Sequence, residues 1–179
     1  MPMKKLYVFL TLPLFIVTFC IGTASATTGS ATMAVTVTVA SSISLILQTD
    51  ASGLTLTNSG TSAVTAAFGT MSAYGGTVPT GVTRTVNAPT NWKISTPFDP
   101  VVQVANQTSA TYTLTAQLQT ADSTNTWAIG ATTVTSASAA TLTSTGTYGT
   151  SALTFSLTIP FSETAGLVSN TINFVATAN

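Results

Sequence analysis

The sequence contains no histidine and only one cysteine, Cys20, among its 179 residues. Nucleophilic catalysis by a Ser-His-Asp or Cys-His system requires an imidazole, and protein zinc sites are built mainly from His and Cys. These absences exclude the commonest hydrolase and zinc chemistries. They also exclude an internal disulfide, so packing and hydrogen bonds must stabilise the fold.

Charged residues are also scarce, at 4% of the chain against about 25% in typical globular proteins. Those after residue 26 are Arg84, Lys93, Asp50, Asp99, Asp122 and Glu163. Two isolated cations cannot displace the counterions of a nucleic acid, which excludes nucleic acid as a partner. A pair of carboxylates is the remaining route to hydrolysis, but the three aspartates lie in turn-like sequence, where Asp commonly binds its own backbone. We expect no catalytic residue, no cofactor and no metal ion, and therefore no enzyme.

The first 26 residues have the layout of a signal peptide. Lys4 and Lys5 precede an apolar run over residues 6–21, and the small residues at 24–26 form a cleavage signature. A membrane anchor is the alternative, but Thr11 and Pro13 interrupt the run and it is shorter than the roughly 20 residues that a spanning helix needs. We expect cleavage after Ala26, loss of Cys20 with the leader, and export to the cell surface or the extracellular space.

The remaining chain, about 150 residues long, is the size of one domain and is patterned for β-structure. Apolar residues alternate with small or hydroxyl residues over 33–39, and similar runs recur between turn-forming residues such as Asp99-Pro100 and Gly130. This spacing is typical of an all-β sandwich or barrel. Strands are expected at 43–47, 54–57, 64–71, 82–86, 92–95, 101–105, 111–119, 126–129, 141–145, 153–159 and 171–176.

Two tryptophans, Trp92 and Trp127, are the candidate binding residues of the middle of the chain. Each stands in a strand-like segment, two residues before an Ile. An exposed indole could stack on a sugar, whereas aromatic residues in alternating strands are more often sandwich core. Both interpretations stay open, with core favoured. The polar stretch 122–125 carries several oxygens that calcium prefers, but its spacing fits a turn better than a calcium loop.

The alternating stretch 34–45 and the Ala-Gly turn before a final strand, over residues 165–175, resemble the ends of chaperone-usher pilins, especially the disulfide-free, colonisation-factor-like group. The resemblance implies an antiparallel, immunoglobulin-like β-sandwich over residues 41–179 that lacks one strand. It also implies an N-terminal extension, residues 27–40, that completes a neighbouring subunit. The donor side chains would be Met33, Val35, Val37 and Val39. The alternative is that this strand pairs within its own domain.

The expected function is that of a non-enzymatic structural subunit of a bacterial surface fibre or coat. The resemblance implies copies of the chain or related surface subunits as partners, together with a periplasmic chaperone. The two Trp-x-Ile segments and the Ala-Gly turn also faintly resemble WxL-type wall-associated domains. A secreted module that binds a glycan or the cell wall is therefore the alternative, with Trp92 and Trp127 as its stacking residues.

Overall fold

The computed structural model describes residues 33, 34, 36, 43–105 and 109–179. The chain divides into two compact units, Met1–Thr38 and Val39–Asn179, and the fold given below is that of the second. The expected signal peptide lies outside the described residues, as do three of the four expected donor residues, Val35, Val37 and Val39. Within the described ranges no helix is long and apolar enough to span a membrane.

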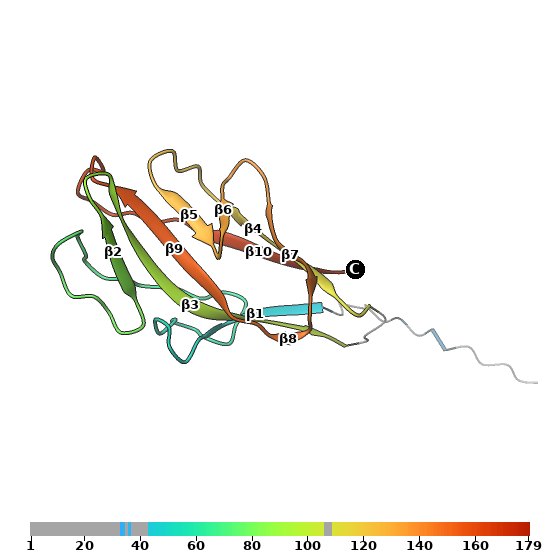
Figure 1. Ribbon diagram of the computed structural model, residues 1–179. Coiled ribbons are helices and arrows are strands. Elements are labelled where there is room, and N and C mark those ends of the chain that lie inside the picture. Colours follow the sequence, from blue (N-terminus) through green and yellow to red (C-terminus); the bar gives the residue numbers. More distant parts are fainter. Residues whose placement is uncertain (1–32, 35, 37–42, 106–108) are drawn as a thin grey trace, which may run out of the picture. The chain divides into compact units, whose positions relative to one another are not determined.

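The described residues form antiparallel strands in two sheets and no helix (Figure 1), which confirms the predicted all-β sandwich. The larger sheet has the order β1-β3-β9-β5-β6, with β2 and β8 also paired to β3, and the smaller sheet has the order β10-β4-β7. The strands are β1 (Ile43–Thr49), β2 (Thr83–Asn87), β3 (Asn91–Val104), β4 (Tyr112–Leu118), β5 (Thr126–Ile129), β6 (Thr132–Val134), β7 (Ala140–Gly146), β8 (Gly149–Thr150), β9 (Leu153–Pro160) and β10 (Ile172–Ala178).

The hydrophobic core lies where side chains from both sheets meet. In β3 and β4 buried residues alternate with half-buried ones, as expected for strands with one face on the core. The loop region between β1 and β2 adds Leu54, Leu56 and Ala73 to the buried residues. The largest buried cluster includes Trp92, Ile94 and Phe98 of β3, Ala116 and Leu118 of β4, Trp127 and Ile129 of β5, and Leu157 and Ile159 of β9.

The long strand β3 corrects the prediction of a turn at Asp99-Pro100. It continues through both Pro97 and Pro100 because the side chains at alternate positions from Trp92 to Val102 all lie on the buried face. Each proline also lies where β3 changes partner. Pro97 pairs with β9 between the segments paired to β2 and β1, and Pro100 pairs with β1 between those paired to β9 and β8. A proline there removes little of the ladder, since it lacks a strand partner on one side.

Two other predicted strands, 54–57 and 64–71, are wrong. The structure has only isolated bridges in this region, Leu47 with Thr61 and Thr57 with Thr65. Alternation over a few residues is compatible with a strand but does not ensure that a ladder of hydrogen bonds forms. Here the segment instead packs side chains such as Leu56 and Phe68 against the core as irregular chain.

The buried hydroxyl of Thr96 fastens this irregular region to β3. Thr96 is 2% exposed, and its Oγ1 accepts a hydrogen bond from the Leu54 N–H (2.7 Å) and donates one to the Gly81 carbonyl (2.8 Å). The backbones of Gly53 and Gly81 approach so closely that a Cβ on Gly81 would collide with Gly53. Gly81 also has a φ of +78°, which other residues rarely adopt.

Candidate functional site

Trp127 lies in the core with its one polar atom paired. The residue is 6% exposed, its ring packs against Phe155 with centroids 6.0 Å apart, and its Nε1–H donates to Asp122 Oδ2 at 2.7 Å. A buried indole N–H requires such an acceptor. The structure therefore places Trp127 as a core residue, the alternative favoured from the sequence, and offers no exposed ring face for stacking on a sugar.

Trp92 is likewise a core residue. It is 9% exposed and lies in β3 opposite Val86 of β2 and Ile159 of β9. The two tryptophans belong to one buried cluster, so the structure brings them together as packing residues. In this conformation neither supplies the platform that the glycan-binding alternative assigned to it.

Asp122 organises the turn that precedes β5. Its Oδ1 accepts hydrogen bonds from the N–H groups of Thr124 (3.0 Å) and Asn125 (2.9 Å), while Oδ2 accepts from Asn125 Nδ2 (3.1 Å) and from Trp127. Burial by itself raises the pKa of Asp122, but these hydrogen bonds together outweigh it and lower the pKa below its ordinary value of 3.8. This agrees with the polar turn favoured from the sequence, because the carboxylate is already occupied by donors of its own loop.

Asp50 and Asp99 are neighbouring carboxylates whose pKa values shift in opposite directions. Burial raises the pKa of Asp99, and the nearby charge of Asp50 raises it further. Hydrogen bonds from the Ser52 hydroxyl (2.6 Å) and N–H (2.7 Å) instead lower the pKa of Asp50. Asp99 is therefore the carboxyl group of the two that keeps its proton to higher pH. Neither residue lines a described cavity.

Asp122 and Glu163 line one shallow polar cavity of about 300 Å³. Asn125 Oδ1 and Glu163 Oε2 are buried there without a hydrogen-bond donor in the described structure. Both atoms are acceptors, and no basic side chain lines the cavity. Across the described residues no cluster of three or more His, Cys, Asp or Glu has the arrangement of a metal site.

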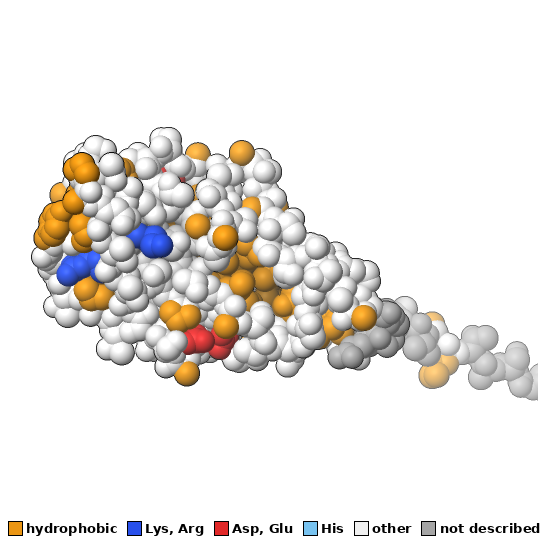
Figure 2. Space-filling view, viewed as in Figure 1, with side chains coloured by type: hydrophobic (Ala, Val, Ile, Leu, Met, Phe, Trp, Pro, Cys, Tyr) orange, Lys and Arg blue, Asp and Glu red, His pale blue; other side chains and the backbone are white. Residues whose placement is uncertain are grey.

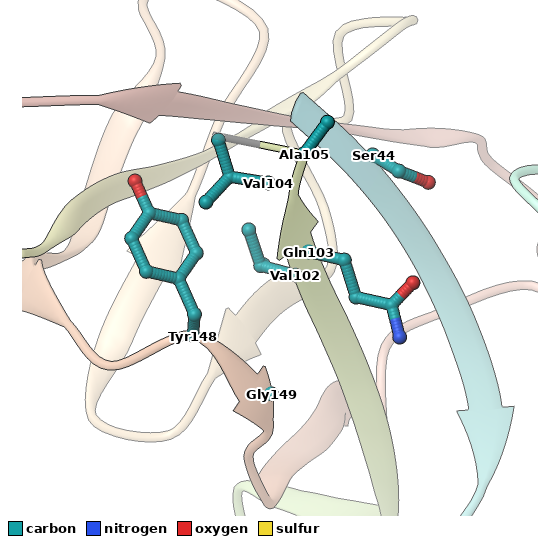
Figure 3. Close-up of a pocket in the computed structure, with 7 residues that line it drawn as sticks. All are labelled: Ser44, Val102, Gln103, Val104, Ala105, Tyr148 and Gly149. Atoms are coloured by element: carbon teal, nitrogen blue, oxygen red, sulfur yellow. The ribbon is translucent and has the colours of Figure 1, made fainter. Parts of the chain in front are cut away.

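A second cavity, of about 530 Å³, lies beside the last residues of β3. Figure 3 shows Tyr148, Val102 and Val104 on one side of β3, whereas Gln103 and Ser44 point to the other side. The Tyr148 hydroxyl donates to the Thr111 carbonyl at 3.1 Å. None of the lining residues is charged, so this cavity offers apolar surface and no acid or base.

Along one side of the sandwich, called the open side below, β1 and β10 are the edge strands of the two sheets. These strands lie near each other but belong to different sheets and do not pair. Side chains of both contribute to the core yet are only partly buried: Ile43 and Leu45 of β1, and Ile172, Phe174 and Ala176 of β10. The ring of Phe174 packs against the buried ring of Phe98 with centroids 5.7 Å apart. Core side chains are therefore left partly exposed on this side.

β10 is also an edge strand. It pairs with β4 along its whole length, from Ile172 opposite Leu118 to Ala178 opposite Tyr112, and no described strand pairs with its other edge. Its outward face carries Val175, which is 55% exposed. A seven-residue edge with apolar side chains on both faces is a template for another strand. Of the four expected donor residues only Met33 is described, and it is 86% exposed.

Tyr74 is an exposed aromatic residue that the sequence analysis did not select. It is 74% exposed and stacks on Phe161 with centroids 6.0 Å apart and ring planes 5° apart. In the sequence it precedes Gly75-Gly76, which predicts only a turn. The signal that was available is an aromatic residue inside a glycine-rich turn, where a large side chain has no strand face to occupy.

Comparison of the chain with protein-family models, with curated proteins and with solved structures finds no match.

Proposed function

We propose that this protein is an exported, non-enzymatic structural subunit of a bacterial surface fibre or coat. In this proposal the N-terminal strand of one copy adds to the sandwich of the next, and the protein acts at the cell surface or outside the cell. The observation that carries the proposal is the open side of the sandwich beside β10. A periplasmic chaperone that covers this side before assembly belongs to the same proposal.

The chemistry of the open side supports strand addition. An incoming strand would pair its N–H and C=O groups with the free edge of β10 and would cover the partly buried side chains of β1 and β10 with its own apolar face. Main-chain hydrogen bonds give such complexes affinity, while alternate side chains give them register.

The segment 33–39 has the properties of such a strand. In an extended conformation it would present Met33, Val35, Val37 and Val39 on one face, and its seven residues equal the length of β10. The intervening residues are Ala or Thr, which suit a face left toward solvent. An apolar strand exposed to water is unfavourable, and a free strand edge has unpaired backbone groups. Association of the segment with β10 would bury the apolar side chains and pair those groups.

The test compares self-association of the chain that begins at Thr27 with that of two variants, by size-exclusion chromatography with light scattering. Val37→Asp places a charge on the apolar donor face and should reduce assembly to monomers. Thr38→Asp, the matched control, places the same charge on the opposite face and should still assemble. A synthetic peptide of residues 33–39 should bind the Val37→Asp monomer and raise its melting temperature, since a ligand that binds only the folded state stabilises it.

A wild-type chain that stays monomeric at all concentrations, with and without a periplasmic extract, would refute the strand-donation mechanism. Equal self-association of Val37→Asp and Thr38→Asp would refute it as well. The N-terminal strand would then be a strand of its own domain, as the sequence analysis left open. The alternative of a glycan- or wall-binding module cannot rely on Trp92 and Trp127, because both are buried.

A further inference from the structure

We propose that Tyr74 is the platform of a carbohydrate-binding site that takes the ring of a neutral sugar. The site lies at the end of the sandwich that carries the β2–β3 hairpin and the end of β9, whereas β10 runs toward the opposite end (Figure 1). It is therefore independent of strand donation. Figure 2 shows hydrophobic side chains gathered on the left end of the molecule, the end where Figure 1 shows this hairpin.

The ring of Tyr74 is held in place from behind. It stacks almost parallel on Phe161, with centroids 6.0 Å and ring planes 5° apart. Phe161 is itself anchored, because its N–H donates to the Thr90 carbonyl of the β2–β3 hairpin at 3.1 Å. One face of Tyr74 thus rests on a half-buried aromatic ring, and with 74% of the residue exposed much of the rest of the ring faces solvent.

The turn that carries Tyr74 is held as firmly as its ring. The Ser72 N–H donates to the Gly75 carbonyl (3.1 Å), and the Gly75 N–H donates to Ser72 Oγ (2.9 Å). Arg84 Nη1 of β2 then donates to the carbonyls of both residues, Ser72 at 2.9 Å and Gly75 at 2.7 Å. One of the two cations among the described residues therefore fixes the backbone on both sides of Tyr74.

This combination separates Tyr74 from an ordinary exposed side chain. Single exposed hydrophobic residues are common and need no function; Leu167, at 91% exposed, has no ring contact and no such clamp among the described interactions. An aromatic ring left in water does not contribute the stabilisation that its burial would give. A ring with a fixed backbone and orientation is, however, preorganised to bind a ligand, which increases affinity. The arrangement favours a ligand that docks on a flat ring.

The chemistry of the surroundings points to a neutral sugar. The π face of an aromatic ring is electronegative and attracts the polarised C–H groups on one face of a pyranose. The β2–β3 hairpin that anchors Phe161 carries the uncharged, exposed side chains of Asn87, Thr90 and Thr85, which suit hydroxyl groups. It also carries one half-buried cation, Lys93, opposite Thr85. The Arg84 charge is directed at backbone carbonyls, and no acid takes part in the contacts described here. A single ring is also smaller than the clusters of buried anchors that protein partners use.

The experiment is native affinity electrophoresis of the exported chain in gels that contain mixed-linkage β-glucan, xyloglucan, glycol chitin or dextran. We expect retardation in at least one gel, a loss of at least tenfold in affinity for Tyr74→Ala, and retention of binding by Tyr74→Phe and Tyr74→Trp. Arg84→Gln keeps the ring but releases the turn and should weaken binding severalfold. The matched control is Leu167→Ala, which truncates another exposed hydrophobic side chain and should bind as the wild type does.

Wild-type migration that is unchanged in all four gels overturns the proposal, as does a Tyr74→Ala protein that binds as tightly as the wild type. Urea unfolding of each variant shows that binding is lost without loss of the fold. If Tyr74→Ala changes self-association in light scattering but not migration in polysaccharide, Tyr74 contacts protein and the carbohydrate site is refuted. Polymer formation should be the same for Tyr74→Ala and the wild type, which separates this result from failure of strand donation.

Discussion

At the scale of single residues, the few charged side chains act on nearby polar groups of the chain itself. Asp122 accepts hydrogen bonds from its own turn and from the indole of Trp127, and Arg84 fixes the turn of Tyr74. In a chain with 4% charged residues, the structural effects of these two charges can be tested separately.

Replacing Asp122 by Ala should destabilise the protein by about 1–3 kcal/mol, because the buried Trp127 N–H would lose its acceptor. Urea unfolding followed by tryptophan fluorescence measures the change. Asp50→Ala is the control, since the hydrogen bonds that Asp50 accepts from Ser52 are exposed, and it should change the free energy of unfolding by less than about 0.5 kcal/mol. Equal effects of the two substitutions would show that the Asp122–Trp127 hydrogen bond contributes little.

The pKa shifts of Asp122 and Asp99 predict opposite dependences of stability on pH. The pKa of Asp122 is lowered in the folded state, so its contribution is present above the unfolded value near 4 and is lost as pH falls through the folded value. The pKa of Asp99 is raised, so its contribution is present below the unfolded value and is lost as pH rises through the folded value.

The corresponding measurement is urea unfolding of Asp122→Asn and Asp99→Asn between pH 3 and pH 7. Relative to the wild type, Asp122→Asn should be less stable at pH 7, and this deficit should shrink toward pH 3. Asp99→Asn should be at least as stable as the wild type at pH 7 and should lose that advantage toward pH 3. Parallel curves for the two variants would contradict the assignment of opposite shifts.

At the scale of elements, the sandwich is organised by β3 and by the chain that packs irregularly beside it. β3 contacts two partner strands in succession along each edge, and its prolines lie at the changes of partner. Thr96 connects the same strand to the backbone at Leu54 and Gly81. Irregular chain of this kind needs such side-chain hydrogen bonds because it lacks a ladder.

Thr96→Val keeps the shape of the side chain but removes its hydroxyl. The Leu54 N–H and the Gly81 carbonyl would both lose a buried partner, and we expect a loss of about 2–4 kcal/mol in the free energy of unfolding. Thr83→Val, at an exposed position of β2, is the matched control and should be within about 0.5 kcal/mol of the wild type. A neutral Thr96→Val would mean that the irregular region is fastened by its apolar contacts alone.

At the scale of the whole described domain, two sheets of unequal size leave one side of the core partly uncovered. Phe98 on β3 is buried, whereas its neighbour Phe174 on β10 is only half-buried. The same aromatic pair thus spans the boundary between the closed core and the open side. The proposed strand addition would complete this side.

Alanine substitutions in this aromatic pair test the proposed closure. Phe98→Ala should cost about 3–5 kcal/mol, as for a large buried aromatic, and Phe174→Ala should cost less because its ring is already partly in water. The peptide of residues 33–39 should raise the melting temperature of the Val37→Asp monomer, and adding Phe174→Ala to that monomer should reduce the rise. Thermal unfolding with and without peptide measures both effects. An unchanged rise would place the peptide away from β10.

The sequence predicted most strands because alternation between apolar and hydroxyl residues depends only on which face is buried. It failed at 54–57 and 64–71, where alternation exists but only isolated bridges form, and at Asp99-Pro100, where burial of alternate side chains outweighs the turn preference of the dipeptide. The sequence left both core packing and sugar stacking open for Trp92 and Trp127, because a tryptophan in a strand has the same sequence pattern whether its side chain points into the core or toward solvent.

The sequence by itself determined the class of fold, the scarcity of charge and the absence of an imidazole, because composition and period-2 patterning are local properties. Only the tertiary structure decided which aromatic rings are buried, that Asp122 accepts a hydrogen bond from the Trp127 indole, and that β10 is an edge strand on the open side of the sandwich. Those outcomes depend on which strands pair and which residues distant in sequence meet. Tyr74 shows this most clearly, because its exposure, its stacking on Phe161 and its clamp by Arg84 arise from contacts between three separate segments of the chain.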